Sequence, residues 1–90
     1  MKIEDLKPGD VFYDIHSTIY TIRYEYLCEY PHNEDYFIII NRVSEEPERI
    51  YKTHLQQILD KNLLTRDDAE KERISLLEAY LEKKQSKYKT

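Results

Sequence analysis

The sequence predicts an α+β fold in which a small, strongly bent antiparallel sheet is followed by two C-terminal helices. Runs that alternate apolar and polar residues fill the first half of the chain, turn-forming segments separate them, and the apolar period becomes helical after residue 53. Strands that all precede the helices indicate a meander covered by helices. The length of 90 residues suits one domain with a single core. We expect this domain over 1–84, with a β-meander (1–53), a helical part (54–84) and a flexible basic tail (85–90).

Each expected strand is bounded by turn-forming residues. The strands are Val11–Ile15, 18–30, 36–43 and 49–53, and the turns between them are 16–18, 31–35 and 44–48. A type II turn is expected before the first strand, because Pro8 presets φ and Gly9 accepts a positive φ. The centre of the third strand, "YFIII", is apolar on both faces, as in a strand covered on both sides.

The segment "LKPGDVF", residues 6–12, resembles the first strand of Src-homology-3-like small barrels. The resemblance covers only these residues. It implies that four to five strands roll into a barrel, as the alternative to an open, bent sheet. The second strand is long for a compact barrel and would have to bend or bulge midway.

The helical part contains two segments with separate start signals. Thr53 and Gln56 have the spacing of a capping box, and Thr65 is placed to cap the second helix. The second helix is expected over 66–84, with apolar residues at helical spacing. The expected core joins sheet to helices and consists of Phe12, Ile22, Ile38, Ile40, Leu55, Leu59, Leu77 and Leu81.

Composition excludes several classes of protein. The single glycine argues against a phosphate-binding loop, and the single cysteine, Cys28, rules out an internal disulfide and is expected to be a small core residue. The beginning of the chain lacks a signal-peptide pattern, and its longest apolar run is too short to cross a bilayer. We expect a cytoplasmic protein without a membrane contact.

No residue pattern indicates an enzyme, a cofactor or a metal site. His16, His32 and His54 lie in separate turns or caps without metal-ligand spacing, and nothing around Cys28 resembles a catalytic cysteine. We expect the acidic pairs to be solubilising or dipole-matching charges.

The tyrosines are the main candidates for function. Alternation places four of them, with Ile22 and Cys28, on one face of the second strand. Such a face is either cross-strand packing or a partly buried interface, and tyrosine is frequent in binding surfaces. The expected partner-binding residues are Tyr20, Tyr24, Tyr26, Tyr30, Tyr36, Glu25 and Glu29. Their partner is another protein or a second copy, and the carboxylates favour a basic surface on it.

Charge is segregated along the chain, whose net charge is −4. Residues 1–48 carry 11 acidic and 4 basic side chains, and residues 49–90 carry 7 and 10, which gives −7 and +3. The basic residues support an alternative in which a small barrel contacts nucleic acid with its helices. The expected contacts are Arg66, Lys71, Arg73, Lys83 and Lys84.

These observations predict a non-enzymatic binding module that docks on another protein. The chain is similar in style to small accessory proteins of bacteriophages, which implies inhibition of a host enzyme or an anti-defence role. Besides the nucleic-acid alternative, the tyrosines leave open an oligomeric sponge for a nucleotide-like ligand.

Overall fold

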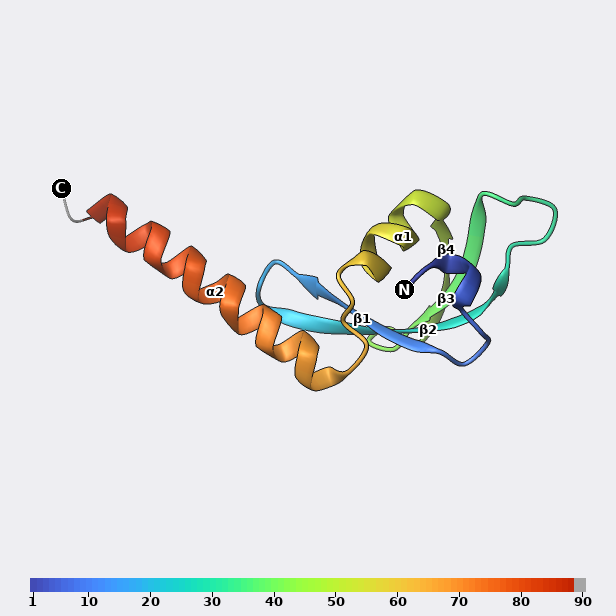
Figure 1. Ribbon diagram of the computed structural model, residues 1–90, viewed down its shortest axis with the longest axis horizontal. Helices are drawn as coiled ribbons and strands as arrows, with labels where there is room; N and C mark the ends of the chain where they lie inside the picture. Colours follow the sequence, from blue (N-terminus) through green and yellow to red (C-terminus); the bar gives the residue numbers. More distant parts are fainter. Residues whose placement is uncertain (89–90) are drawn as a thin grey trace.

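The computed structural model describes the backbone of residues 1–88 and the side chains of residues 1–84, and it confirms the α+β fold. The elements, in chain order, are a 3-10 helix (Ile3–Asp5), β1 (Val11–His16), β2 (Tyr20–Glu29), β3 (Tyr36–Asn41), β4 (Glu46–Tyr51), α1 (Lys52–Asp60) and α2 (Arg66–Tyr88) (Figure 1). The strands form one antiparallel sheet in chain order. Among the described residues β1 and β4 are the two ends of the sheet and do not pair with each other. The sheet is therefore open, and the barrel alternative is wrong.

The turn at Pro8-Gly9 and the turn between β1 and β2 form where the sequence predicts them. Gly9 has φ 94°, and the amide of Asp10 donates to the carbonyl of Lys7 at 2.9 Å, which closes the Pro8-Gly9 turn. The β1–β2 hairpin turns through Ser17 and Thr18, whose φ values are 51° and 60°. His16 pairs with Tyr20, so the loop has three residues, 17–19, and left-handed φ at its first two residues lets the amide of Ile19 donate to the carbonyl of His16 at 3.0 Å.

The third turn lies earlier than the sequence predicts. It occupies residues 42–45, where the side chain of Asn41 accepts a hydrogen bond from the amide of Val43 at 2.9 Å. Strand β4 then begins at Glu46 and includes Pro47, which the sequence assigns to the turn. A proline is tolerated there because β4 is an edge strand.

Helix α1 covers one face of the sheet, which we call the core face. Leu55 and Leu59 pack there as predicted, together with Ile58. The sheet residues of the buried cluster are Phe12, Tyr26, Phe37, Ile39 and Ile50. Of the predicted core, Phe12, Leu55 and Leu59 are buried, and Ile22 is half-buried. The prediction is wrong for Ile38 and Ile40, because they alternate with the buried Phe37 and Ile39 and so lie on the opposite face.

The predicted capping box at the start of α1 is wrong. Tyr51 occupies the N-cap position and makes no side-chain capping hydrogen bond with the described residues. Gln56 instead accepts a hydrogen bond from the amide of Ile3 at 3.1 Å and donates one to the carbonyl of Met1 at 3.0 Å. The side chain that was expected to cap the helix therefore holds the N-terminal segment against α1.

The segment between α1 and α2 passes along the free edge of β1 from one face of the sheet to the other. Lys61 Nζ lies 2.6 Å from Asp14 Oδ1 on the core face, and the carbonyl of Leu63 accepts a hydrogen bond from the amide of Tyr13 at 2.9 Å. Helix α2 then begins on the opposite face, where Thr21 donates to Glu70 at 3.3 Å. The predicted cap is present, because Thr65 Oγ1 accepts a hydrogen bond from the amide of Asp68 at 3.1 Å.

The second half of α2 extends beyond the sheet (Figure 1). The molecule measures 56 × 24 × 23 Å, and its radius of gyration is 15.6 Å, against about 12 Å for a compact chain of this length. Leu77 is half-buried and Leu81 is 47% exposed, so the prediction that Leu81 belongs to the core is wrong. Helix α2 continues to Tyr88. The predicted flexible tail covers residues 85–90, whose side chains lie outside the described part of the chain, as does the backbone of 89–90.

Truncation of a helix leucine should have very different effects in α1 and α2. We expect Leu59→Ala to lower the free energy of unfolding by about 2–5 kcal/mol, because it opens a cavity at a fully buried site. Leu81→Ala should change it by less than about 0.5 kcal/mol, because the side chain is exposed. Urea denaturation followed by circular dichroism measures both, and equal losses would contradict the projecting position of α2.

The β1–β2 turn should be stabilised by glycine. Thr18 is β-branched and has φ 60°, so Thr18→Gly should raise the free energy of unfolding by about 1 kcal/mol. Thr21→Gly, within β2, is the control and should lower it. A destabilising Thr18→Gly, measured in the same urea titrations, would contradict the left-handed turn.

Candidate functional site

A β-bulge divides the tyrosines of β2 between the two faces of the sheet. The pairing with β3 shifts between Tyr26, opposite Ile39, and Cys28, opposite Ile38. Because side chains alternate with a period of two, one extra residue reverses which face every later residue joins. The predicted single face that runs from Tyr20 to Tyr30 is therefore wrong.

The tyrosines before the bulge belong to the core face. Tyr26 is 7% exposed, and Tyr24 is half-buried with its ring stacked on Phe12 at a centroid distance of 5.6 Å. Burial raises the pKa of both phenols above the ordinary value of 10.0. Tyr20 is exposed at the hairpin end of β2, beside His16. Tyr24 and Tyr26 thus support the fold and are not available to a partner.

Tyr30 follows the bulge and lies on the opposite face of the sheet, which we call the open face. There it forms a cluster with Tyr36 of β3 and Tyr51 of β4. The ring centroids of Tyr30 and Tyr36 are 6.1 Å apart, and those of Tyr36 and Tyr51 are 5.4 Å apart. The guanidinium carbon of Arg49 lies 4.6 Å from the centroid of Tyr36 and 5.6 Å from that of Tyr30. We call these four residues the ring cluster. Tyr51 and Arg49 are not among the candidates predicted from the sequence. The sequence places the turn between β3 and β4 at 44–48, which does not bring Tyr51 opposite Tyr36 in the sheet.

The acidic residues predicted to meet a partner have different surroundings. Glu25 faces Arg42, with two oxygen–nitrogen distances of 3.1 Å, and Arg42 also binds Glu45 at 3.0 Å. These hydrogen bonds raise the pKa of Arg42 above its ordinary value. Glu29 is exposed, opposite Phe37. Glu25 is therefore engaged within the molecule, and Glu29 alone of this pair faces solvent.

The projecting half of α2 carries the most exposed apolar surface of the helix. Buried Ala69 and half-buried Arg73 and Leu77 mark the side of α2 that faces the sheet. Residues three or four positions apart share a helix face, so this side continues past the hairpin. Its apolar residues beyond the hairpin are Leu77, Tyr80 (50% exposed) and Leu81 (47%), which we call the α2 stripe. Ile74 and Leu76 are about 160° apart and flank this side, and Lys84 lies within it, over the ring of Tyr80.

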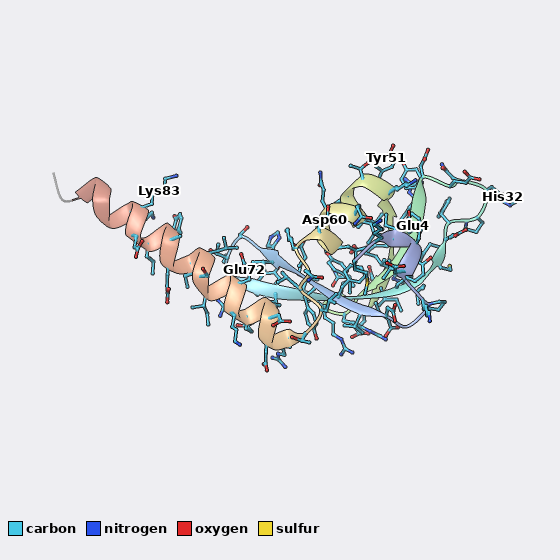
Figure 2. The ribbon with its side chains drawn as sticks, in the orientation of Figure 1. Glu4, His32, Tyr51, Asp60, Glu72 and Lys83 are labelled. Carbon is cyan, nitrogen blue, oxygen red and sulfur yellow. The ribbon has the colours of Figure 1, made fainter. Side chains whose placement is uncertain are left out.

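Of the basic residues expected to contact nucleic acid, Arg66, Arg73 and Lys84 share one side of α2, but two of them are engaged and Lys71 and Lys83 lie off that side. Arg73 binds Glu70 at 2.9 Å, and Lys84 lies over the ring of Tyr80 at 5.3 Å. Lys71 follows Arg66 by five positions, which places it about 140° around the helix. Lys83 projects on the distant part of α2 in Figure 2. These positions favour separate roles over a continuous phosphate-binding track.

Other candidate chemistry has no assembled site in the described residues. No group of three or more His, Cys, Asp or Glu that could hold a metal occurs there. None of the described helices has the length and apolarity needed to span a bilayer. Comparison of the chain with protein-family models, curated proteins and solved structures finds no match. The prediction that Cys28 is a core residue is wrong: the bulge turns it to the open face, where it is exposed.

The exposure of Cys28 provides a direct test of the bulge. The folded protein should react with a water-soluble disulfide reagent within about tenfold of the rate of the urea-unfolded chain, because the thiol is accessible. If the strand alternated without a bulge, Cys28 would share the buried face with Tyr26. Strong protection of the thiol in the folded state would therefore contradict the register described here.

Proposed function

We propose that this protein is a non-enzymatic binding module that docks on another protein through the α2 stripe. One observation carries the proposal. The side of α2 that packs on the sheet continues beyond it with Tyr80 and Leu81, and all residues from Glu78 to Lys84 are exposed. Exposed apolar side chains in a contiguous patch are typical of interaction sites.

The energetics of the projecting segment support this interpretation. An isolated helix shorter than about 12–15 residues is marginal in water. The projecting turns gain little from tertiary packing, so apolar side chains there stabilise the folded protein weakly. They become useful when a partner covers them, and a helix whose apolar side chains enter a groove of another protein is a recurrent mode of recognition.

The chemistry of the partner follows from the residues around the stripe. The required groove is apolar and accepts Leu77, Tyr80 and Leu81, while Glu78 and Lys83 on its flanks can meet charges of either sign. The ring cluster on the open face offers a second contact region. The similarity in style to small bacteriophage accessory proteins implies that docking inhibits a host enzyme or defence complex. This role is part of the proposal, and the docking surface is the part the structure supports.

A charge placed in the α2 stripe should abolish docking without unfolding the protein. Immobilised protein should retain a defined partner from bacterial lysate, and Leu81→Glu should weaken purified-partner binding by at least about 2 kcal/mol. Ser75→Glu adds the same charge at an exposed position about 160° around the helix from Leu77, so it should bind normally. Circular dichroism verifies that both variants are folded.

Two results would contradict the proposal. The first is equal partner binding by Leu81→Glu and Ser75→Glu. The second is sedimentation showing that the stripe is already occupied by a second copy in a dimer that Leu81→Glu dissociates. The first result would direct attention to the ring cluster, and the second would replace the foreign partner with self-association.

A further inference from the structure

A cleft on the open face lies where three segments meet, apart from the α2 stripe and the ring cluster. It has a volume of about 460 Å³. The segments are the β1–β2 hairpin, the turn after β3 and the first residue of α2. The lining residues are Tyr13, Thr21, Arg23, Arg42, Val43, Glu45 and Arg66.

Positive charges outnumber negative ones in this cleft, and only some of the positive side chains are already paired with a carboxylate. Three guanidinium groups and one carboxylate line it. Glu45 binds Arg42 at 3.0 Å, and Glu25 behind it binds the same arginine at 3.1 Å. The guanidinium groups of Arg23 and Arg66 make no hydrogen bond or close ion pair with another described residue, and Arg66 acts on Glu70 only through its charge, which helps to lower the pKa of that carboxyl. Arg42 is thus held in place by carboxylates, while two guanidinium groups remain available to an anion.

The uncharged part of the lining restricts the kind of anion. Tyr13 is half-buried and contributes an aromatic ring, and Val43 contributes an exposed apolar side chain. The Thr21 hydroxyl donates to Glu70, and Arg73 binds the same carboxylate. The hydrogen bonds of Glu70 are therefore directed to Thr21 and Arg73 and not to the arginines of the cleft. Tyr13 and Val43 give an otherwise polar cleft one aromatic and one apolar contact.

We propose that this cleft binds a small phosphorylated ligand of the nucleoside phosphate class, whose phosphate groups are held by Arg23 and Arg66. Guanidinium groups bind phosphate oxygens in a bidentate, charge-assisted manner. The volume lies in the range of small-molecule sites, about 300–1,000 Å³. The ring of Tyr13 and the methyl groups of Val43 would contact the nucleoside.

The proposal assigns a small ligand in preference to a nucleic-acid strand. Asp67 and Asp68 follow Arg66 directly at the start of α2, and they would repel a phosphate backbone that continued past the cleft. The two available arginines can serve one or two phosphate groups, and no described basic track leads away from them.

Calorimetric titration with defined probes tests the site at about 0.1 M salt. Adenosine 5′-diphosphate and inorganic pyrophosphate should bind with a stoichiometry of one, and adenosine should not bind detectably. Arg23→Gln and Arg66→Gln should each weaken binding by at least about tenfold, since each removes a charge-assisted hydrogen bond. Arg49→Gln makes the same charge change in the ring cluster of the same face and should change binding by less than twofold.

Nuclear magnetic resonance of the amide groups locates the bound probe. The largest shifts should fall on Tyr13, Thr21, Arg23 and Val43. Tighter binding of the diphosphate than of pyrophosphate supports the nucleoside contact, and equal binding would contradict the nucleoside part of the proposal. The proposal is overturned by an absence of saturable binding below about 10 mM, by equal loss in Arg49→Gln, or by citrate binding as tightly as pyrophosphate.

Discussion

The one-residue bulge in β2, between Tyr26 and Cys28, decides what each face of the sheet contains. Before the bulge, the strand gives its aromatic side chains to the core, where Tyr24 stacks on Phe12 and Tyr26 is buried. After it, the same alternation directs Tyr30 to the open face. Without the bulge, Tyr30 would point to the core face, and its ring would not contact the ring of Tyr36. Because of the bulge, the same segment contributes tyrosines both to the buried core and to the open face.

The crossing of the β1 edge has a comparable effect on the helices. The backbone hydrogen bond between Tyr13 and Leu63 and the ion pair between Lys61 and Asp14 fix the connection. As a result α1 and the start of α2 lie on opposite faces. In the described part of the chain the core is closed by α1 together with Leu6, Ile3 and Leu64, so α2 can leave the sheet after a few turns. The cleft and the projecting stripe both follow from this one connection.

The three surfaces differ in the chemistry they offer. The ring cluster is aromatic with a cation placed over its rings, the α2 stripe is apolar, and the cleft is lined by guanidinium groups. The cleft and the ring cluster share the open face, whereas the stripe projects beyond the hairpin. Because these surfaces are separate, a small ligand and a protein partner need not compete for the same residues. A polar chain with a small core has room for such an arrangement, because few of its residues are needed for burial.

The sequence by itself determined the features that depend on local chemistry. The turn at Gly9 requires a positive φ, the hydroxyl of Thr65 is in position to cap a helix, and the spacing of Leu55, Ile58 and Leu59 defines an apolar side. These features need only neighbouring residues, so the order of strands and helices could be read from them.

Only the tertiary structure decided the features that depend on distant partners. The amide of Ile3 and the carbonyl of Met1 engage the side chain of Gln56 and remove it from capping. The pairing of β2 with β3 sets the bulge and the exposure of Cys28. Leu81 has the periodicity of a core residue, but its exposure depends on how far the sheet extends beneath α2. Helical spacing defines an apolar side of a helix, and the physical contact that covers it is set by the rest of the fold.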